Sequence, residues 1–156
     1  MSIETKDLLL GLSEEEAAGV MALAVPVRVP SGGVLFQLGA EADRLFLVVR
    51  GRIDLTLPMR IRDGEEDVLL EEKHPGETLG WSGLIPPHRF TLKAKAQMET
   101  ELLAFPRAAL LSHFDAHPAV GLAMTRNVAT VIGHRLQIFQ TLWAREMQRM
   151  VEQRYA

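Results

Sequence analysis

The sequence predicts a mainly β domain, an antiparallel roll or sandwich framed by one N-terminal helix and by helices at its C-terminal end. Between Val25 and about Phe105 the segments are short, rich in β-branched and large apolar residues, and separated by glycines. On both sides of this stretch the apolar residues recur with a helical period. With 156 residues, the chain is long enough for one domain with its own core. We therefore expect a single domain over residues 1–156, with a β-roll at about 25–105 and C-terminal helices at about 106–154.

Composition excludes several classes of function. The chain has no cysteine, which excludes disulfides, thiolate metal sites and cysteine nucleophiles, and fits a reducing compartment. Its net charge of −3 and its pI near 6.0 argue against a nucleic-acid surface. No run of about 18 apolar residues and no secretion signal is evident, so we expect no membrane insertion and a cytoplasmic location.

The first elements follow from local signals. Ser13 and Glu16 form a capping box that predicts the start of the N-terminal helix. Apolar and polar residues alternate over residues 52–57 and again over 91–97, which predicts two half-buried strands. Asp63-Gly64, between two strand-like runs, predicts a hairpin.

The C-terminal part reads as two helices. Pro106 suits the first turn of a short helix that runs toward Phe114, and Pro118 suits the start of a longer one. The longer helix carries an apolar stripe with gaps of four, three, four, four and three, close to a coiled-coil seam. Its members are Ile132, Leu136, Phe139, Trp143, Met147 and Met150. The stripe either packs on the domain's own core or forms a homodimer, and we favour the homodimer because the helix reaches past the roll.

Two ordered sets of residues resemble the cyclic-nucleotide-binding domain family, with its catabolite-activator-like β-roll. The matching segments are residues 33–36, Gly39, 42–43, 45–46 and 51–53, then residues 75–77, 80–91 and 103–105. With the flanking helices, the resemblance covers roughly residues 8–136. It implies a double-stranded β-helix, jelly-roll-like, with an N-terminal helix and a long C-terminal helix.

The resemblance also implies a phosphate-binding cassette. Gly80 matches the glycine that opens it, and Ser82, Gly83 and Leu84 match its short helix. Arg89 matches the arginine that pairs with the cyclic phosphate, and Thr91 follows it into the next strand. On the C-terminal helix, Phe139 could stack on a purine and Gln140 could hydrogen-bond to it.

Two residues depart from the family pattern. Trp81 stands where the family carries the glutamate that accepts the ribose hydroxyl, and Phe90 stands where serine or alanine is usual. Because indole can only donate, a ribose hydroxyl buried there would lose about 1–3 kcal/mol. Trp81 is either a stacking platform or a plug that fills the pocket, and we favour the plug. Two interpretations of Arg89 have about equal weight. It either binds an anionic effector, or it has no ligand and is exposed to solvent or paired internally, for example with Glu77.

The sequence leaves two functions open. In the first, the chain is a regulatory sensor that binds a small anionic effector (cAMP, cGMP or another phosphate-bearing molecule) and signals through its C-terminal helix. In the second, it is a degenerate domain that binds no ligand and serves dimerisation or interaction with a partner protein. We expect no enzyme activity. We also expect no metal site at His113 and His117, and no direct DNA binding, because the chain ends at Ala156.

Overall fold

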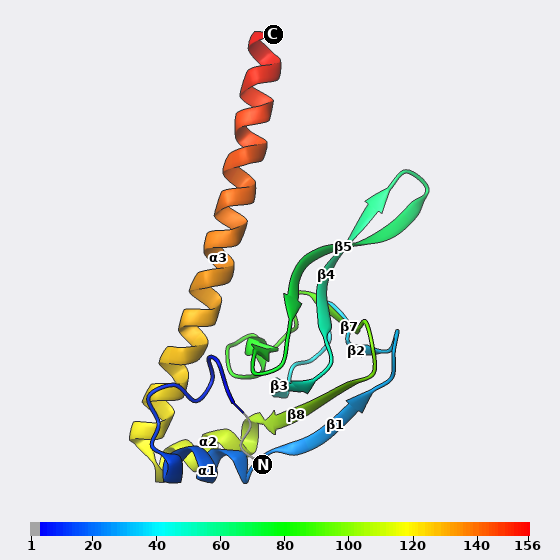
Figure 1. Cartoon of the computed structure of the whole chain (residues 1–156). Coiled ribbons are helices and arrows are strands. Elements are labelled where there is room, and N and C mark those ends of the chain that lie inside the picture. Colours follow the sequence, from blue (N-terminus) through cyan, green and yellow to red (C-terminus); the bar gives the residue numbers. More distant parts are fainter. Residues whose placement is uncertain (1–3) are drawn as a thin grey trace.

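The computed structural model describes residues 4–156, which form eight strands and three α-helices (Figure 1). The strands are β1 (Val25–Val29), β2 (Val34–Phe36), β3 (Arg44–Arg50), β4 (Ile53–Ile61), β5 (Gly64–Lys73), β6 (Thr78–Leu79), β7 (Lys93–Ala96) and β8 (Thr100–Pro106). The helices are α1 (Glu14–Met21), α2 (Arg107–Ala116), α3 (Pro118–Tyr155) and a short 3₁₀ turn, η1 (Trp81–Gly83).

The strands form two four-stranded antiparallel sheets. One sheet has the order β1-β8-β3-β6, and the other has the order β2-β7-β4-β5. Their facing side chains make one apolar core, which includes Phe36, Phe46, Leu55, Phe90 and Leu102. The predicted mainly β fold, a double-stranded β-helix framed by helices, is confirmed.

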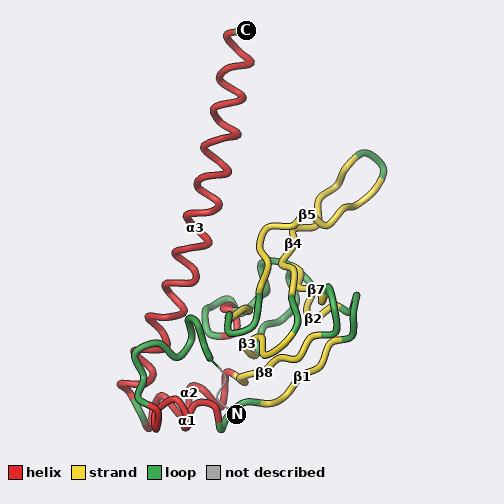
Figure 2. Tube along the Cα trace, in the orientation of Figure 1, coloured by secondary structure: helices red, strands yellow, loops and turns green. Residues whose placement is uncertain are grey.

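The helices cover the outer face of the first sheet. A second apolar cluster joins Leu45, Leu47 and Phe105 of that sheet to Val20 of α1 and Met124 of α3. Figure 2 shows α1 and α2 side by side at the base of α3, below the strands. The predicted capping box is present, because Glu16 N–H donates to Ser13 Oγ and Ser13 N–H donates to the Glu16 carboxylate.

The β4–β5 hairpin extends beyond the roll (Figure 1). The predicted hairpin is present, but its turn residues are Arg62 and Asp63 rather than Asp63 and Gly64, because Ile61 pairs with Gly64. Closer to the roll, the pairing register shifts, because Leu55 faces Glu71 whereas Thr56 faces Leu69. Leu70 is thus an extra residue, and this bulge sets which residues of β5 face the interior.

Helix α3 is the longest element and begins with Pro118 in its first turn, as predicted. At 38 residues it spans about 57 Å. Its fully buried residues all lie near its beginning, and the last of them is Val128. Arg135 still contacts Glu71 of β5, and the C-terminal part of α3 then extends away from the roll (Figure 1).

Candidate functional site

The cassette starts where β6 ends. Gly80 has φ 78°, a left-handed conformation that glycine adopts without strain, and the chain then turns into η1. Gly83 lies directly beneath the Arg44 carbonyl of β3, where a Cβ atom would collide with the backbone. Both positions therefore favour glycine, the first for its backbone angle and the second for lack of space. The predicted short cassette helix is therefore present as η1, with Ser82 and Gly83 buried.

The space that the cassette encloses is almost completely filled. It is a cavity of about 10 Å³, bordered by Gly80, Trp81, Ser82, Phe90 and Thr91 of the cassette region. Phe36, Leu55, Leu92 and Arg135 complete its wall. A cavity of this size holds about one water molecule at most.

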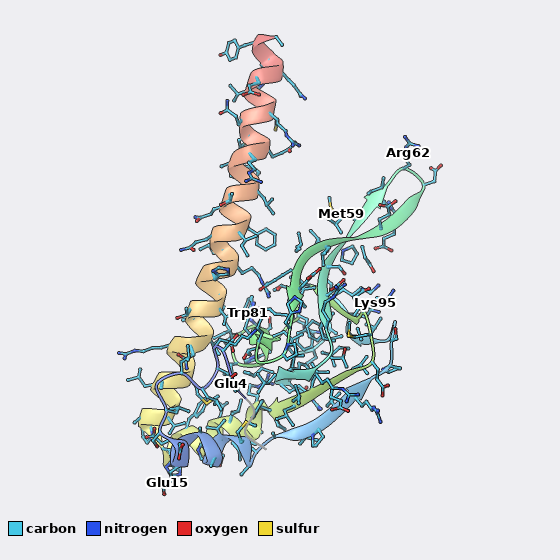
Figure 3. The ribbon with its side chains drawn as sticks, in the orientation of Figure 1. Glu4, Glu15, Met59, Arg62, Trp81 and Lys95 are labelled. Atoms are coloured by element: carbon cyan, nitrogen blue, oxygen red, sulfur yellow. The ribbon has the colours of Figure 1, made fainter. Side chains whose placement is uncertain are left out.

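Aromatic side chains account for much of this closure. The Phe36 and Phe90 rings stack with their centroids 3.7 Å apart and their planes 7° apart. Trp81 borders the cavity and packs against the apolar cluster of the helices. Figure 3 places Trp81 between the roll and α3. The Phe36–Phe90 pair also borders a second, open hollow of about 360 Å³, which is lined in addition by Val27 and Phe46.

A charged cluster lies at the edge of the same cavity. The Glu71 carboxylate of β5 accepts hydrogen bonds from Arg135 of α3, at 2.9 Å from Nη2 and 3.1 Å from Nε. Its other oxygen lies 2.6 Å from Nζ of the buried Lys73. Burial alone would raise the pKa of Glu71, but the hydrogen bond and charge of Lys73 and the charge of Arg135 outweigh it. The pKa of this carboxyl is therefore held below its usual value of about 4.5.

Besides the buried Gly83, four predicted site residues do not border the cavity. Arg89 is exposed, and its Nη1 donates to the Gly39 carbonyl at 3.4 Å. Within residues 4–156 it forms no ion pair, with Glu77 or with any other carboxylate. Phe139 and Gln140 are exposed on α3, beyond Arg135. Leu84 lies behind the cassette, where it packs on the helical cluster.

The sequence did not identify Phe36, Glu71, Lys73 or Arg135 as residues of the site. Alternation in β4 placed Leu55 on the inner face, but only the bulge at Leu70 shows that Glu71 lies opposite Leu55. His88, next to Arg89, turns back so that its Nδ1 lies 3.0 Å from the Ser82 carbonyl. Among the residues that the structure describes, no group of three or more metal-ligating side chains comes together, and no helix is long and apolar enough to cross a membrane.

A family model, described as the cyclic nucleotide-binding domain, matches residues 26–117 of this chain. The chain belongs to this family. It therefore carries the fold of a regulatory nucleotide-sensing module, and the resemblance seen in the cassette and glycines is confirmed.

Two curated relatives illustrate the range of the family. A lysophospholipase nte1 of Neurospora crassa is 33% identical over 113 residues, which are 72% of this chain and 7% of the fungal protein. A CRP-like cAMP-activated global transcriptional regulator of Mycobacterium tuberculosis is 26% identical over 119 residues, or 76% of this chain and 52% of the regulator. The chain thus spans a small part of the first relative and about half of the second.

Solved structures agree with this assignment. The N-terminal domain of a transcriptional regulator from Streptomyces coelicolor aligns with a TM-score of 0.71 and 28% identity, covering 83% of this chain and 88% of that one. The catabolite activator protein of Thermus thermophilus aligns with a TM-score of 0.74 and 26% identity, covering 88% of this chain and 61% of that one. The likeness to both extends over the roll and the flanking helices.

Proposed function

We propose that this chain is a regulatory domain of the cyclic-nucleotide-binding type whose nucleotide position is closed by its own side chains. It acts through self-association of α3 and requires no cyclic nucleotide. The observation that carries the proposal is the cavity of about 10 Å³ at the cassette. A ligand of nucleotide size needs a pocket on the order of 300 Å³ or more. The difference is too large for small side-chain adjustments to provide.

The proposed surface for self-association is the apolar stripe of α3. Phe139 is 38% exposed and Trp143 is 66% exposed, although aromatic side chains on a soluble helix are usually covered. Leu136 and Met150, on the same stripe, are also exposed. A stripe with near-heptad spacing can pack against a second copy of itself, so the occupant we propose is α3 of another copy of this chain.

A charge on this stripe tests the dimer. Trp143→Glu is expected to halve the molar mass measured by light scattering during size-exclusion chromatography, because it places a carboxylate in the apolar seam. Arg145→Glu, a charge change on the opposite face of the same helix, should leave the mass of the dimer unchanged. A wild-type chain that already elutes as a monomer would refute self-association.

Ligand titration tests the closed nucleotide position. In calorimetry and thermal-shift assays at up to about 1 mM, we expect neither cAMP nor cGMP to change the wild-type protein, because a ligand stabilises only the state that binds it. The same titrations of the isolated sensor region of a cAMP-binding relative serve as a positive control. A saturable cyclic-nucleotide signal from the wild-type chain would overturn the proposal.

A second candidate function keeps the effector. Arg89 is exposed and forms no ion pair within residues 4–156, which leaves its guanidinium available to a phosphate or carboxylate on a small molecule. In this case an anionic effector would dock beside residues 80–90 and shift the position of α3. A thermal shift with an anionic ligand that Arg89→Ala abolishes would favour this function over the first one.

A further inference from the structure

Glu71 is an acidic residue on the inner face of the second sheet. It lies on β5 opposite Leu55, whose side chain borders the cassette cavity. Its side chain is only 18% exposed. Inward-facing carboxylates are unusual in a roll, because an ion loses its hydration when it is buried. The position of Glu71 therefore requires partners that compensate for this loss.

Those partners come from two different elements. Lys73, two residues farther along β5, contacts Oε1, whereas Nε and Nη2 of Arg135 on α3 both contact Oε2. A guanidinium and an ammonium that converge on one pair of oxygens form the arrangement by which proteins bind carboxylate or phosphate groups of ligands. Here the anion is part of the chain.

The cluster also joins α3 to the roll. Among residues 4–156, no hydrogen bond or ion pair connects α3 to a strand beyond Arg135, and the side-chain bonds farther along are internal to the helix. Arg135 itself is 11% exposed and borders the cavity. The pair with Glu71 is thus the last polar connection before α3 leaves the domain.

We propose that Glu71 is a built-in counter-anion, which occupies the position beside Arg135 and Lys73 that an anionic ligand group would take and thereby holds α3 against β5. This inference rests on the closed nucleotide position proposed above and identifies Glu71 as the positioning residue that keeps anions out. Without the carboxylate, Lys73 and Arg135 form an anion site for a phosphate or sulfate group.

Glu71→Ala tests this role, because alanine removes the carboxylate together with its volume and so leaves room for an anion beside Lys73 and Arg135. The probe is inorganic phosphate, titrated in thermal-shift and calorimetric assays at constant ionic strength. The variant should bind phosphate saturably, at least about tenfold more tightly than the wild type, and the double variant Glu71→Ala/Arg135→Gln should lose that binding. Glu72→Ala, which removes the neighbouring exposed carboxylate, is the matched control and should bind phosphate no better than the wild type.

Hydrogen exchange of the α3 amides around Arg135 provides a second readout. Exchange should be faster in Glu71→Ala than in the wild type, and phosphate should slow it again. If Glu71→Ala is unfolded in phosphate-free buffer, circular dichroism should show that phosphate restores the fold. The inference is overturned if the variant stays unfolded at every phosphate concentration, binds phosphate no better than the wild type, or keeps its binding after Arg135 is replaced. Cyclic-nucleotide binding by the wild type would instead refute the proposed function.

Discussion

Phe90→Ala is expected to lower the free energy of unfolding by about 3–5 kcal/mol. Phe90 is buried in the core between the sheets, and its ring stacks on Phe36 at 3.7 Å. Alanine removes the ring, so the variant loses its burial and leaves a void, and the stacked pair contributes about 0.5–1.5 kcal/mol more. Urea unfolding at pH 7, followed by circular dichroism, measures the change.

The location of Phe90 explains why the neighbours cannot refill the space. Its ring helps to separate the cavity of about 10 Å³ from the open hollow of about 360 Å³, so its removal is expected to join the two and admit water. Leu38→Ala, on an exposed loop residue nearby, is the control and should change stability by about 0.5 kcal/mol or less. A loss below about 1 kcal/mol for Phe90→Ala would show that this ring does not hold the cavity closed.

Local signals in the sequence predicted the elements well, because each depends on residues close together in the chain. The capping box of Ser13 needs only the next three residues, and Asp63-Gly64 predicted the hairpin to within one residue of its turn at Arg62 and Asp63. Pro118 starts α3 because its ring suits the first helical turn and it has no N–H to leave unpaired. The ordered glycines then identified the family, because they mark the turns of the roll. They carry little information about which ligand, if any, the domain binds.

The contents of the site depend on contacts across the fold, which local patterns do not encode. Phe36 meets Phe90 from 54 positions away, so their stacking follows only from how the strands pair. Residues 71–73 are Glu-Glu-Lys, a run of charged side chains that is typical of a solvated strand, yet the bulge at Leu70 places Glu71 opposite Leu55. The preference for Trp81 as a plug agrees with its packing, but its role in ligand exclusion stays a prediction.

A motif can identify the position of Arg89 in the sequence without predicting the direction in which its side chain points. The alternating strand was expected to begin at Thr91, whereas β7 begins at Lys93 and Arg89 lies in the preceding loop, paired through its backbone with Glu41. A loop residue can point either way, and here the neighbouring Phe90 is buried while Arg89 is exposed. Arg135 is the arginine that borders the cavity, and its carboxylate partner comes from β5.

Glu71→Gln is expected to lower the free energy of unfolding by about 3 kcal/mol at pH 7 in buffer without phosphate. Removing one partner of a buried ion pair leaves the other charge uncompensated, which costs about 3–5 kcal/mol. We expect the lower end of this range because Glu71 and Arg135 keep 18% and 11% of their side chains exposed. Glu72→Gln should cost about 1 kcal/mol at most, since the Glu72 side chain is 40% exposed and its partners are also solvated.

The difference between wild type and Glu71→Gln is also expected to depend on pH in a defined direction. The pKa of Glu71 is lower in the folded protein than its ordinary value of about 4.5, so the unfolded chain binds this proton more readily. The stabilisation from the carboxylate is therefore fully present above pH 4.5 and disappears as the pH falls through the lower folded value. Urea titrations from pH 7 to pH 3 should show the two proteins converging in stability below pH 4.5. A constant difference over this range would mean that the charge of Glu71 does not stabilise the fold, whereas convergence would assign that stabilisation to its ion pairs with Lys73 and Arg135.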